Sequence, residues 1–251
     1  MKKHEEIIIS LTSFPARIGT VAEAIGSILS GWRLPDKIVL YLAEPQFPGR
    51  RLPAGLASLP LLEIRWEKND MRSYKKLVPA LRDFPDATII TIDDDLIYPR
   101  DLVSRLLACH KRYPNAVCAR RARRAQSART AEWKLYRWAR CILWGMRPRL
   151  NNIGTSGGGI LFPPRSLYGD ISKSDIFMSI APTTDDLWWW AMAVMNGTKT
   201  AVASRSLHLE YIPGSQSEAL WRINCGQSDE NQKAFDRICQ KYPIKEKLGL
   251  A

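Results

Sequence analysis

The chain has 251 residues, enough for one large domain with a substantial core. Its composition, 45% hydrophobic and 25% charged, is typical of a soluble globular protein, and no run approaches the roughly 18 consecutive apolar residues that a membrane-spanning helix needs. The net charge of +12 suggests an anionic partner. Because the apolar run in "MKKHEEIIISLTSF" is too short for a secretory signal, we expect a cytoplasmic protein.

Strands and helices alternate along the first half of the chain. Runs of β-branched apolar residues predict four strands, and helical spacing of apolar residues predicts two helices. In chain order these elements span residues 5–13, 15–29, 36–42, 61–66, 73–84 and 87–92. The strands are almost continuously apolar, as strands covered on both faces are. The sequence therefore predicts an α/β fold with a mostly parallel sheet flanked by helices, and such sheets bind ligands at the carboxyl ends of their strands.

Three consecutive aspartates follow the last of these strands in "TIITIDDDLIYPRDL", residues 88–102. If the strand continues through them, Asp93 and Asp95 face one side, where two carboxylates make a hard oxygen site for Mg²⁺ or Mn²⁺. A metal there would bridge a diphosphate. The alternative is a polar turn, because Asp is common where strands end. The spaced acids and central glycine of an EF-hand loop are missing.

Two motifs of the second half also suggest ligand contacts. "GTSGGGILFPP" places three glycines before a short strand, where glycine lets a backbone approach a ligand closely; a glycine-rich linker is the alternative. "APTTDDLWWWAMAV" predicts a helix that begins near Asp185 and Asp186. One of these acids suits the N-cap, which leaves the other to point at a substrate.

Most of the excess positive charge lies in one insert, residues 119–150, which we predict to be helical. Between Arg120 and Arg149 the only acid is Glu132, and tryptophans interleave the arginines. Such a segment can lie on an anionic membrane surface, form a phosphate-binding acceptor cleft or be a solvated helical hairpin. A nucleic-acid-binding module would use the same residues, but the aspartates would repel a nucleic-acid backbone. We expect no nucleic-acid partner.

Seven motifs occur in one order along the chain: "ISLTSFPARI", "PDKIVLYL", "IRWEKNDMRSYKKLVPAL", "ATIITIDDDLIYP", "GGGILFPP", "APTTDDLWWWAMAV" and "HLEYIPGSQSEALWRIN". Together they resemble the small GT-A-type glycosyltransferases, related to family 2, of bacterial capsule and lipopolysaccharide gene clusters. The resemblance covers roughly residues 6 to 243. It implies a GT-A (Rossmann-like) sheet whose acidic DxD motif holds a Mn²⁺ or Mg²⁺ ion on a nucleotide-sugar diphosphate.

By this resemblance, Asp95 is the expected metal ligand, with Asp93 on the ribose or the metal and Asp94 near the donor sugar. The resemblance also gives His208 as a late metal ligand, although a lone histidine is more often structural. The nucleotide pocket is expected beside the first strand and the loop before the second helix. Its candidate residues are Thr12, Ser13, Arg17, Asp70 and Lys76.

A carboxylate past the metal site resembles the general base of inverting GT-A enzymes, which accepts the proton of the acceptor hydroxyl. We assign this role to Asp186, with Asp185 as the alternative. Three successive tryptophans on a helix point in different directions, so at least one belongs to the core and another can stack on a sugar. The residues expected to contact the acceptor or the donor sugar are Gly158, Gly159 and Trp189.

The sequence thus predicts one domain over residues 1–251, with a nucleotide-binding half over about 1–115 and an acceptor half over about 151–251. The expected enzyme moves a sugar, with inversion, from a UDP-sugar to a saccharide or lipid-linked saccharide of a bacterial surface polysaccharide. UDP is favoured because it is the commonest carrier in the family. The insert would keep the enzyme on the inner face of the cell membrane. A nucleotidyltransferase is the closest enzyme alternative, but its glycine- and basic-rich phosphate loop is missing after the first strand.

Overall fold

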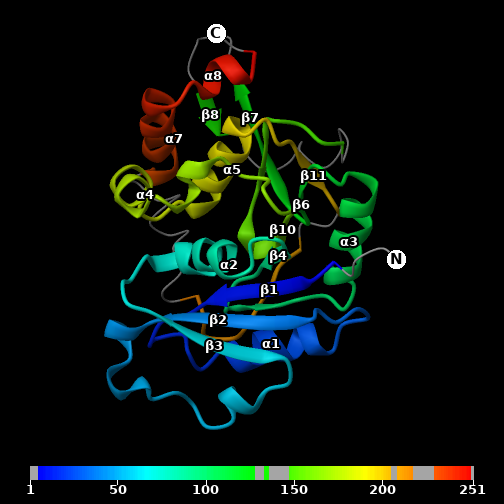
Figure 1. Ribbon diagram of the computed structural model, residues 1–251, viewed down its shortest axis with the longest axis vertical. Helices are drawn as coiled ribbons and strands as arrows, with labels where there is room; N and C mark the ends of the chain where they lie inside the picture. Colours follow the sequence, from blue (N-terminus) through cyan, green and yellow to red (C-terminus); the bar gives the residue numbers. More distant parts are fainter. Residues whose placement is uncertain (1–4, 128–132, 136–146, 205–207, 217–228, 250–251) are drawn as a thin grey trace.

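The structure is a computed structural model that describes residues 5–127, 133–135, 147–204, 208–216 and 229–249. A central sheet with helices on both faces dominates it (Figure 1). The strands are β1 (Ile7–Thr12), β2 (Lys37–Ala43), β3 (Leu62–Glu67), β4 (Thr88–Thr91), β5 (Leu96–Ile97), β6 (Val117–Ala119), β7 (Ala122–Ser127), β8 (Trp133–Leu135), β9 (Asn152–Gly154), β10 (Ile160–Phe162), β11 (Thr200–Val202) and β12 (Glu210–Tyr211). The α-helices are α1 (Val21–Leu29), α2 (Val78–Asp83), α3 (Leu102–Arg112), α4 (Ser174–Ile180), α5 (Asp185–Met195), α7 (Glu230–Lys241) and α8 (Ile244–Lys247).

The main sheet has seven strands in the order β11-β6-β10-β4-β1-β2-β3. Neighbouring strands run parallel except at β10, which is antiparallel to both β4 and β6. The predicted α/β architecture with a mostly parallel sheet is confirmed. Because β10 runs the other way, its first residue, Ile160, pairs with the last residue of β4, Thr91. The glycine-rich segment before β10 therefore lies beside the aspartates that follow β4.

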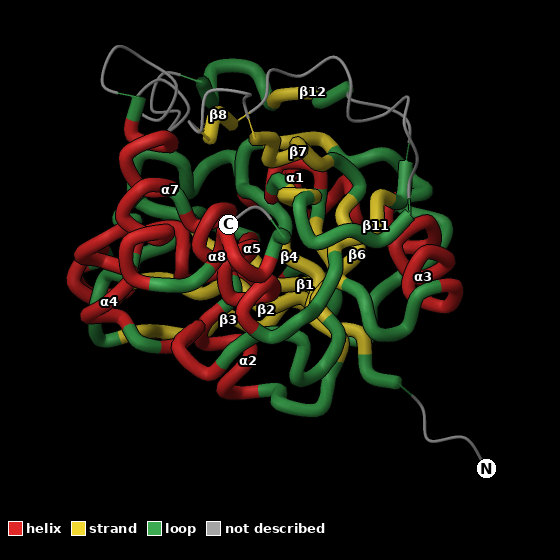
Figure 2. Tube along the Cα trace, turned by 90° about the horizontal axis from the view of Figure 1, so that it is seen from above, coloured by secondary structure: helices red, strands yellow, loops and turns green. Residues whose placement is uncertain are grey.

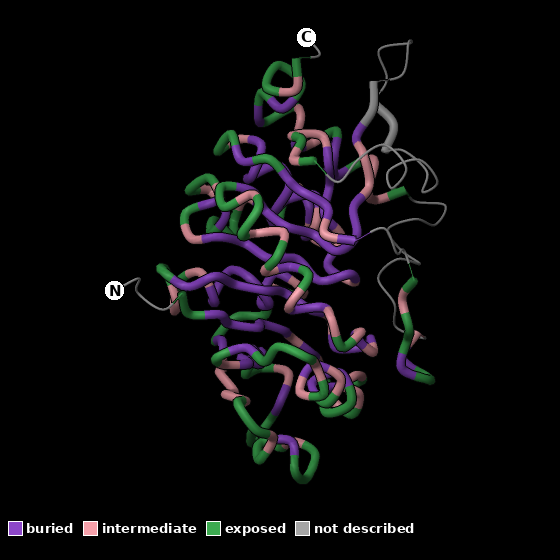
Figure 3. The backbone as a smooth tube through the Cα atoms, turned by 90° about the vertical axis from the view of Figure 1, so that its right-hand side faces the viewer, coloured by how far each residue is buried: buried purple, intermediate pink, exposed green. Residues whose placement is uncertain are grey.

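Both faces of the sheet are covered, which explains why its strands are apolar throughout. Ile7, Ile9 and Leu11 of β1 pack on one side in a core that includes residues of α1 and α3. Ile8 faces the other side, in a core that includes Tyr74 and the residues of α5. Figure 3 shows the buried strands enclosed by more exposed outer segments. No helix of the described residues is long and apolar enough to cross a membrane.

Part of the basic insert forms strands, so the predicted helix is wrong there. β7 pairs antiparallel with β9 and with β8, and these three strands make a sheet separate from the main one. Figure 2 shows β7 and β8 of this sheet. Pairing with β9 gives β7 hydrogen-bonding partners and buries Ala122 and Ala125, and this tertiary contact overrides local helix propensity. Residues 128–132 and 136–146, on which half of the predicted membrane-surface helix falls, lie outside the described residues.

The predicted helices of the first half are shorter than expected. The first begins only at Val21, after a series of turns. The second is divided into a 3₁₀-helix, Arg72–Lys76, and α2, which has Pro79 in its first turn. Proline is tolerated at such a position because the first N–H groups of a helix have no intrahelical partner. Two adjacent lysines at the end of the 3₁₀-helix, Lys75 and Lys76, are both buried and line the cleft described next.

Candidate active site

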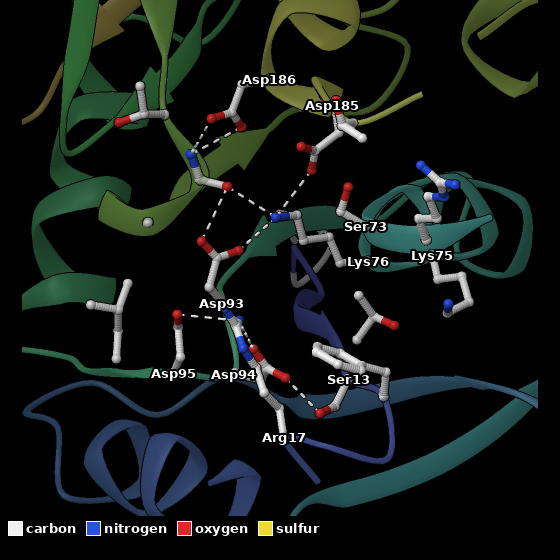
Figure 4. Close-up of a pocket in the computed structure, with 18 of the residues that line it drawn as sticks. Ser13, Arg17, Ser73, Lys75, Lys76, Asp93, Asp94, Asp95, Asp185 and Asp186 are labelled. Carbon is white, nitrogen blue, oxygen red and sulfur yellow. Dashed lines mark hydrogen bonds and ion pairs between the residues drawn. The ribbon is translucent and has the colours of Figure 1, made fainter. Parts of the chain in front are cut away.

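A cleft of about 1120 Å³ opens at the carboxyl ends of β1, β2, β3 and β4. This is the edge at which a parallel sheet is expected to bind a ligand. Residues from the loops after these strands, from the segment before β10, from β7 and from the start of α5 line the cleft (Figure 4). Its polar lining includes Thr12, Ser13, Arg17, Asp70, Lys76, Asp93, Asp94, Asp95, Arg121, Arg123, Ser156, Asp185, Asp186 and Gln216.

The aspartates form a turn and do not continue the strand, because β4 ends at Thr91. The carboxylate of Asp94 accepts hydrogen bonds from Ser13 Oγ at 2.5 Å and from Arg17 Nη1 at 2.9 Å. Burial nevertheless raises the pKa of Asp94, with Arg17 acting in the opposite direction. The loop after β1 therefore holds Asp94 in a fixed place.

Asp95 carries negative charge that its neighbours compensate only in part. Its carboxylate lies 3.2 Å from Arg17 Nη1 and accepts a hydrogen bond from Gln216 Nε2 at 3.0 Å. Burial and then the negative charge of Asp93 raise the pKa of Asp95 to about 6. The segment that contains β12 is joined to this turn, since Ile212 N–H donates to the Asp95 carbonyl. A further cation close to Asp95 would therefore stabilise the ionised form of its carboxylate.

Asp93 turns away from Arg17 toward a buried lysine. Lys76 Nζ donates to Asp93 Oδ1 at 2.5 Å and to Ser156 Oγ at 2.9 Å, and it lies 3.1 Å from Asp185 Oδ2. Figure 4 shows Asp93 and Asp185 on opposite sides of the ammonium group. Burial lowers the pKa of Lys76, but the surrounding carboxylates outweigh it and raise the pKa well above its ordinary value. Lys76 is therefore a permanent cation between the aspartate turn and α5.

Asp186, at the start of α5, is held by the segment before β10. Both of its carboxylate oxygens lie within hydrogen-bond distance of Ser156 N–H, at 3.1 and 3.2 Å. Burial and the neighbouring charge of Asp185 raise the pKa of Asp186 to about 7, whereas Lys76 acts to lower it. No cap hydrogen bond from the side chain of Thr184 is found at the helix start. Asp186 thus combines a fixed carboxylate, access to the cleft and a pKa suited to proton transfer near neutrality.

Asp70 lies at another part of the cleft, beyond β3. It accepts hydrogen bonds from Gln46 Nε2 at 2.9 Å, from Arg72 N–H at 2.8 Å and from Lys75 Nζ. Burial lowers the pKa of Lys75, and its bond to Asp70 works against that shift. Asp70 is one-third exposed, so it still presents oxygen to the cleft.

The structure brings most of the predicted site residues to one cleft. Thr12 also lines it, and its hydroxyl donates to the Tyr41 carbonyl. Trp189 instead lies in the core, 1% exposed, with Phe162 against its edge and Lys76 over its ring. The three tryptophans of α5 are all buried. In this arrangement no face of Trp189 is open to a sugar.

The glycines and His208 also lie differently from what we expected. The close approach at Gly158 is to protein, because a Cβ there would lie 2.7 Å from Arg121 Cβ. Gly159 has φ of +85° and packs on Leu102. His208 is exposed and is not one of the described residues that line the cleft, although Leu209 next to it is. Its role as a metal ligand stays a prediction.

Sequence reasoning missed three residues of the site. Ser156 bridges Lys76, Asp93 and Asp186, and its position before the three glycines was the only signal. Gln216 contacts Asp95 from a segment 121 residues away along the chain. Arg121 is one of many arginines in the basic insert, and it lines the cleft. Such contacts depend on the tertiary fold, which no local pattern contains.

The donor set at the aspartate turn fits a small hard cation in part. In the described part of the chain, no three His, Cys, Asp or Glu side chains are grouped as around a bound metal ion. Asp93 and Asp95 nonetheless supply carboxylate oxygens at the cleft, and burial, followed by the charge of Asp93, raises the pKa of Asp95. Mg²⁺ is commonly bound by one or two carboxylates, with substrate phosphates and water completing its coordination. Two carboxylates are therefore sufficient if the ligand itself brings oxygens.

Comparison with known proteins gives a structural match. No protein-family model and no curated protein sequence matches the chain. The mannosyltransferase PcManGT from Pyrobaculum calidifontis, solved in complex with GDP-Man and Mn²⁺, superposes with a TM-score of 0.56. The match covers 98% of this chain and 68% of the mannosyltransferase, at 12% sequence identity. The two chains share a fold. It is the GT-A-like, mostly parallel α/β architecture that the order of the sequence motifs predicted.

Proposed function

We propose that the protein is a glycosyltransferase that uses a nucleotide-sugar donor and a divalent metal ion. The observation that carries this proposal is the aspartate turn at the carboxyl end of β4, which faces a cleft large enough for a nucleotide sugar. The shared fold supports it, because the matched mannosyltransferase was solved with GDP-Man and Mn²⁺.

Asp95 and Asp93 are the residues that would hold Mn²⁺ or Mg²⁺. When bound, the ion neutralises negative charge on the leaving nucleoside diphosphate. Arg17 keeps Asp94 and Asp95 in place, and Ser13 fixes Asp94 from the loop after β1. Asp94 would then lie near the donor sugar. Asp70, with its exposed oxygen, is suited to a ribose hydroxyl or a base N–H.

Asp186 is the proposed general base. The acceptor hydroxyl attacks the anomeric carbon, its proton passes to the Asp186 carboxylate, and the bond from the anomeric carbon to the phosphate oxygen breaks. Attack from the side opposite the leaving group inverts the configuration at that carbon. Ser156 N–H orients Asp186, and Lys76 supports its ionised form from the donor side. Asp185, paired with Lys76, is the less suitable base.

The finer parts of the proposal come from the sequence resemblance. They are a UDP-sugar donor, a hexosyl group, and a saccharide or lipid-linked saccharide acceptor in bacterial surface polysaccharide synthesis. Contact of the basic insert with an anionic membrane on the cytoplasmic side belongs with them. Because the matched structure contains GDP-Man, GDP-sugars must be tested beside UDP-sugars.

Product analysis tests this function. The protein is incubated with Mn²⁺ and a panel of UDP- and GDP-sugars, and release of free nucleoside diphosphate is followed by chromatography. Asp186→Asn should retain donor binding and lose about 10²- to 10⁴-fold in turnover, the usual contribution of a general base. Full activity of this variant would reject the assignment of Asp186. A nucleotidylated product, formed with release of sugar 1-phosphate in place of nucleoside diphosphate, would favour the nucleotidyltransferase alternative.

A further inference from the structure

The wall of the cleft formed by β7 is positively charged. Arg121 and Arg123 both line the cleft, Arg121 immediately before β7 and Arg123 within it. Alternate residues of an extended chain face the same side, which explains why these two arginines share the cleft. Arg124, on the other face of β7, is not among the residues that line it. The cleft therefore has two arginines opposite in charge to its aspartate turn.

The fold holds Arg121 in place through its backbone. Thr155 N–H donates to the Arg121 carbonyl at 3.0 Å, and Ala122 pairs with Gly154 in the next register position. Gly158 allows the backbone of Arg121 to pack closely, because a Cβ there would lie 3.1 Å from Arg121 N and 2.7 Å from its Cβ. The segment that fixes Asp186 thus also fixes Arg121.

The surroundings of Arg121 disfavour its charge. The residue is buried, with 7% of its surface exposed. Burial, and then the positive charge of Arg123, lower the pKa of Arg121 to about 10, against the effects of Tyr211 and Asp186. Arg123 is only half-buried, and an anion that contacts both guanidinium groups from the cleft would stabilise their charges. Arginine is well suited to this because its planar fork matches carboxylate and phosphate.

The position of this pair relates it to the acceptor. Arg121 lies beside the segment that holds Asp186, because Thr155 N–H donates to the Arg121 carbonyl and the next residue, Ser156, donates its N–H to Asp186. Arg17 and Lys76 instead contact Asp93, Asp94 and Asp95. We propose that Arg121 and Arg123 form an anion-binding subsite for the acceptor, a saccharide with a carboxylate or phosphate near the hydroxyl that receives the sugar. The inference rests on the proposed function, since it takes Asp186 as the base.

Binding of simple saccharides tests the subsite without turnover. Saturation-transfer NMR on the full chain compares methyl β-glucuronide and glucose 6-phosphate with neutral methyl β-glucoside. The anionic sugars should bind preferentially, and Arg121→Gln or Arg123→Gln should weaken their binding about tenfold or more, as expected for charge-assisted hydrogen bonds. Arg124→Gln, from the other face of the same strand, should leave binding unchanged. The glucuronide and phosphate arms distinguish the two sources of negative charge.

Three results would overturn the subsite: no binding of either anionic sugar to the native protein, equal binding of the neutral sugar, or binding that survives both arginine substitutions. Calorimetric titration of the same variants with UDP and GDP separates the donor site. Arg121→Gln should keep nucleotide affinity within about twofold, and a loss of that affinity would assign Arg121 to the donor phosphates instead. If no nucleotide binds the native protein while the anionic sugars still require Arg121, the proposed function fails and the anion site stands.

Discussion

The two charged walls of the cleft are built in opposite ways. On the aspartate wall, each carboxylate has a cationic or polar partner close by, with Arg17 beside Asp94 and Asp95 and Lys76 beside Asp93. On the arginine wall, Arg121 is buried, and the positive charge of Arg123 contributes to lowering its pKa. The carboxylates of the first wall are paired with cations of the protein, and Asp95 is compensated only in part, whereas the second wall brings two arginines together at one strand, β7. In this cleft, the positions at which charges of one sign gather say more about the ligand than the net charge of the chain does.

The largest loss of stability is expected from removing the buried lysine of the aspartate wall, Lys76. Lys76→Met leaves Asp93 and Asp185 without their shared ammonium, and breaking a buried ion pair on one side typically costs about 3–5 kcal/mol of unfolding free energy. Chemical denaturation measures the loss. Lys75→Met is the matched control, because Lys75 is equally buried but its partner, Asp70, is one-third exposed. Equal losses in the two variants would contradict the central place given to Lys76.

A smaller loss of stability is expected from a substitution at Gly158, which packs against Arg121. Gly158→Ala would put a methyl group 2.7 Å from Arg121 Cβ, and overpacking of this kind costs about 1–3 kcal/mol. It should also weaken anionic-sugar binding by shifting Arg121. Gly26→Ala in α1 has no atom within 4 Å of the new methyl group and should be neutral or stabilising by up to about 1 kcal/mol. If thermal unfolding gives both variants the same stability, the close packing at Arg121 is not a constraint.

The smallest effect is expected on the pH dependence of turnover and of stability, through the carboxyl group of Asp186. The pKa of Asp186 is raised to about 7 by burial, so turnover should rise about tenfold between pH 6 and pH 8 as the base ionises. The contribution of Asp186 to the unfolding free energy changes with pH in the opposite direction. Because the folded-state pKa lies above the ordinary value, the unfolding free energy contributed by Asp186 is full below about pH 4 and lost as pH rises through about 7. Asp186→Asn should remove this part of the stability profile, and an unchanged profile would contradict the assigned pKa.

Local patterns in the sequence were sufficient for β1, β2, β3 and β4 and for the position of the aspartates at the end of β4, but they did not predict β6 and β11 or the turn that the aspartates form. The apolar runs of β1, β2 and β4 end where the polar site residues begin, so the same pattern predicts both the end of each strand and the position of the site. The arginine wall could not be predicted in the same way. Arg121 and Arg123 are two of many arginines in the insert, and only the pairing of β7 with β9 determines which of them face the cleft. Burial of Trp189 likewise follows from packing across the sheet.

The most direct test of the account is calorimetric titration of the purified protein with UDP, GDP, CDP and dTDP, with and without Mn²⁺. Asp95→Ala is the test variant, and Asp101→Asn, which removes a surface pair with Arg105, is the control. We expect that one nucleotide binds with a requirement for Mn²⁺, that Asp95→Ala abolishes this binding, and that the control retains it. Failure of all four nucleotides to bind, or binding that is unaffected by Asp95→Ala, would contradict a donor site at the aspartate turn.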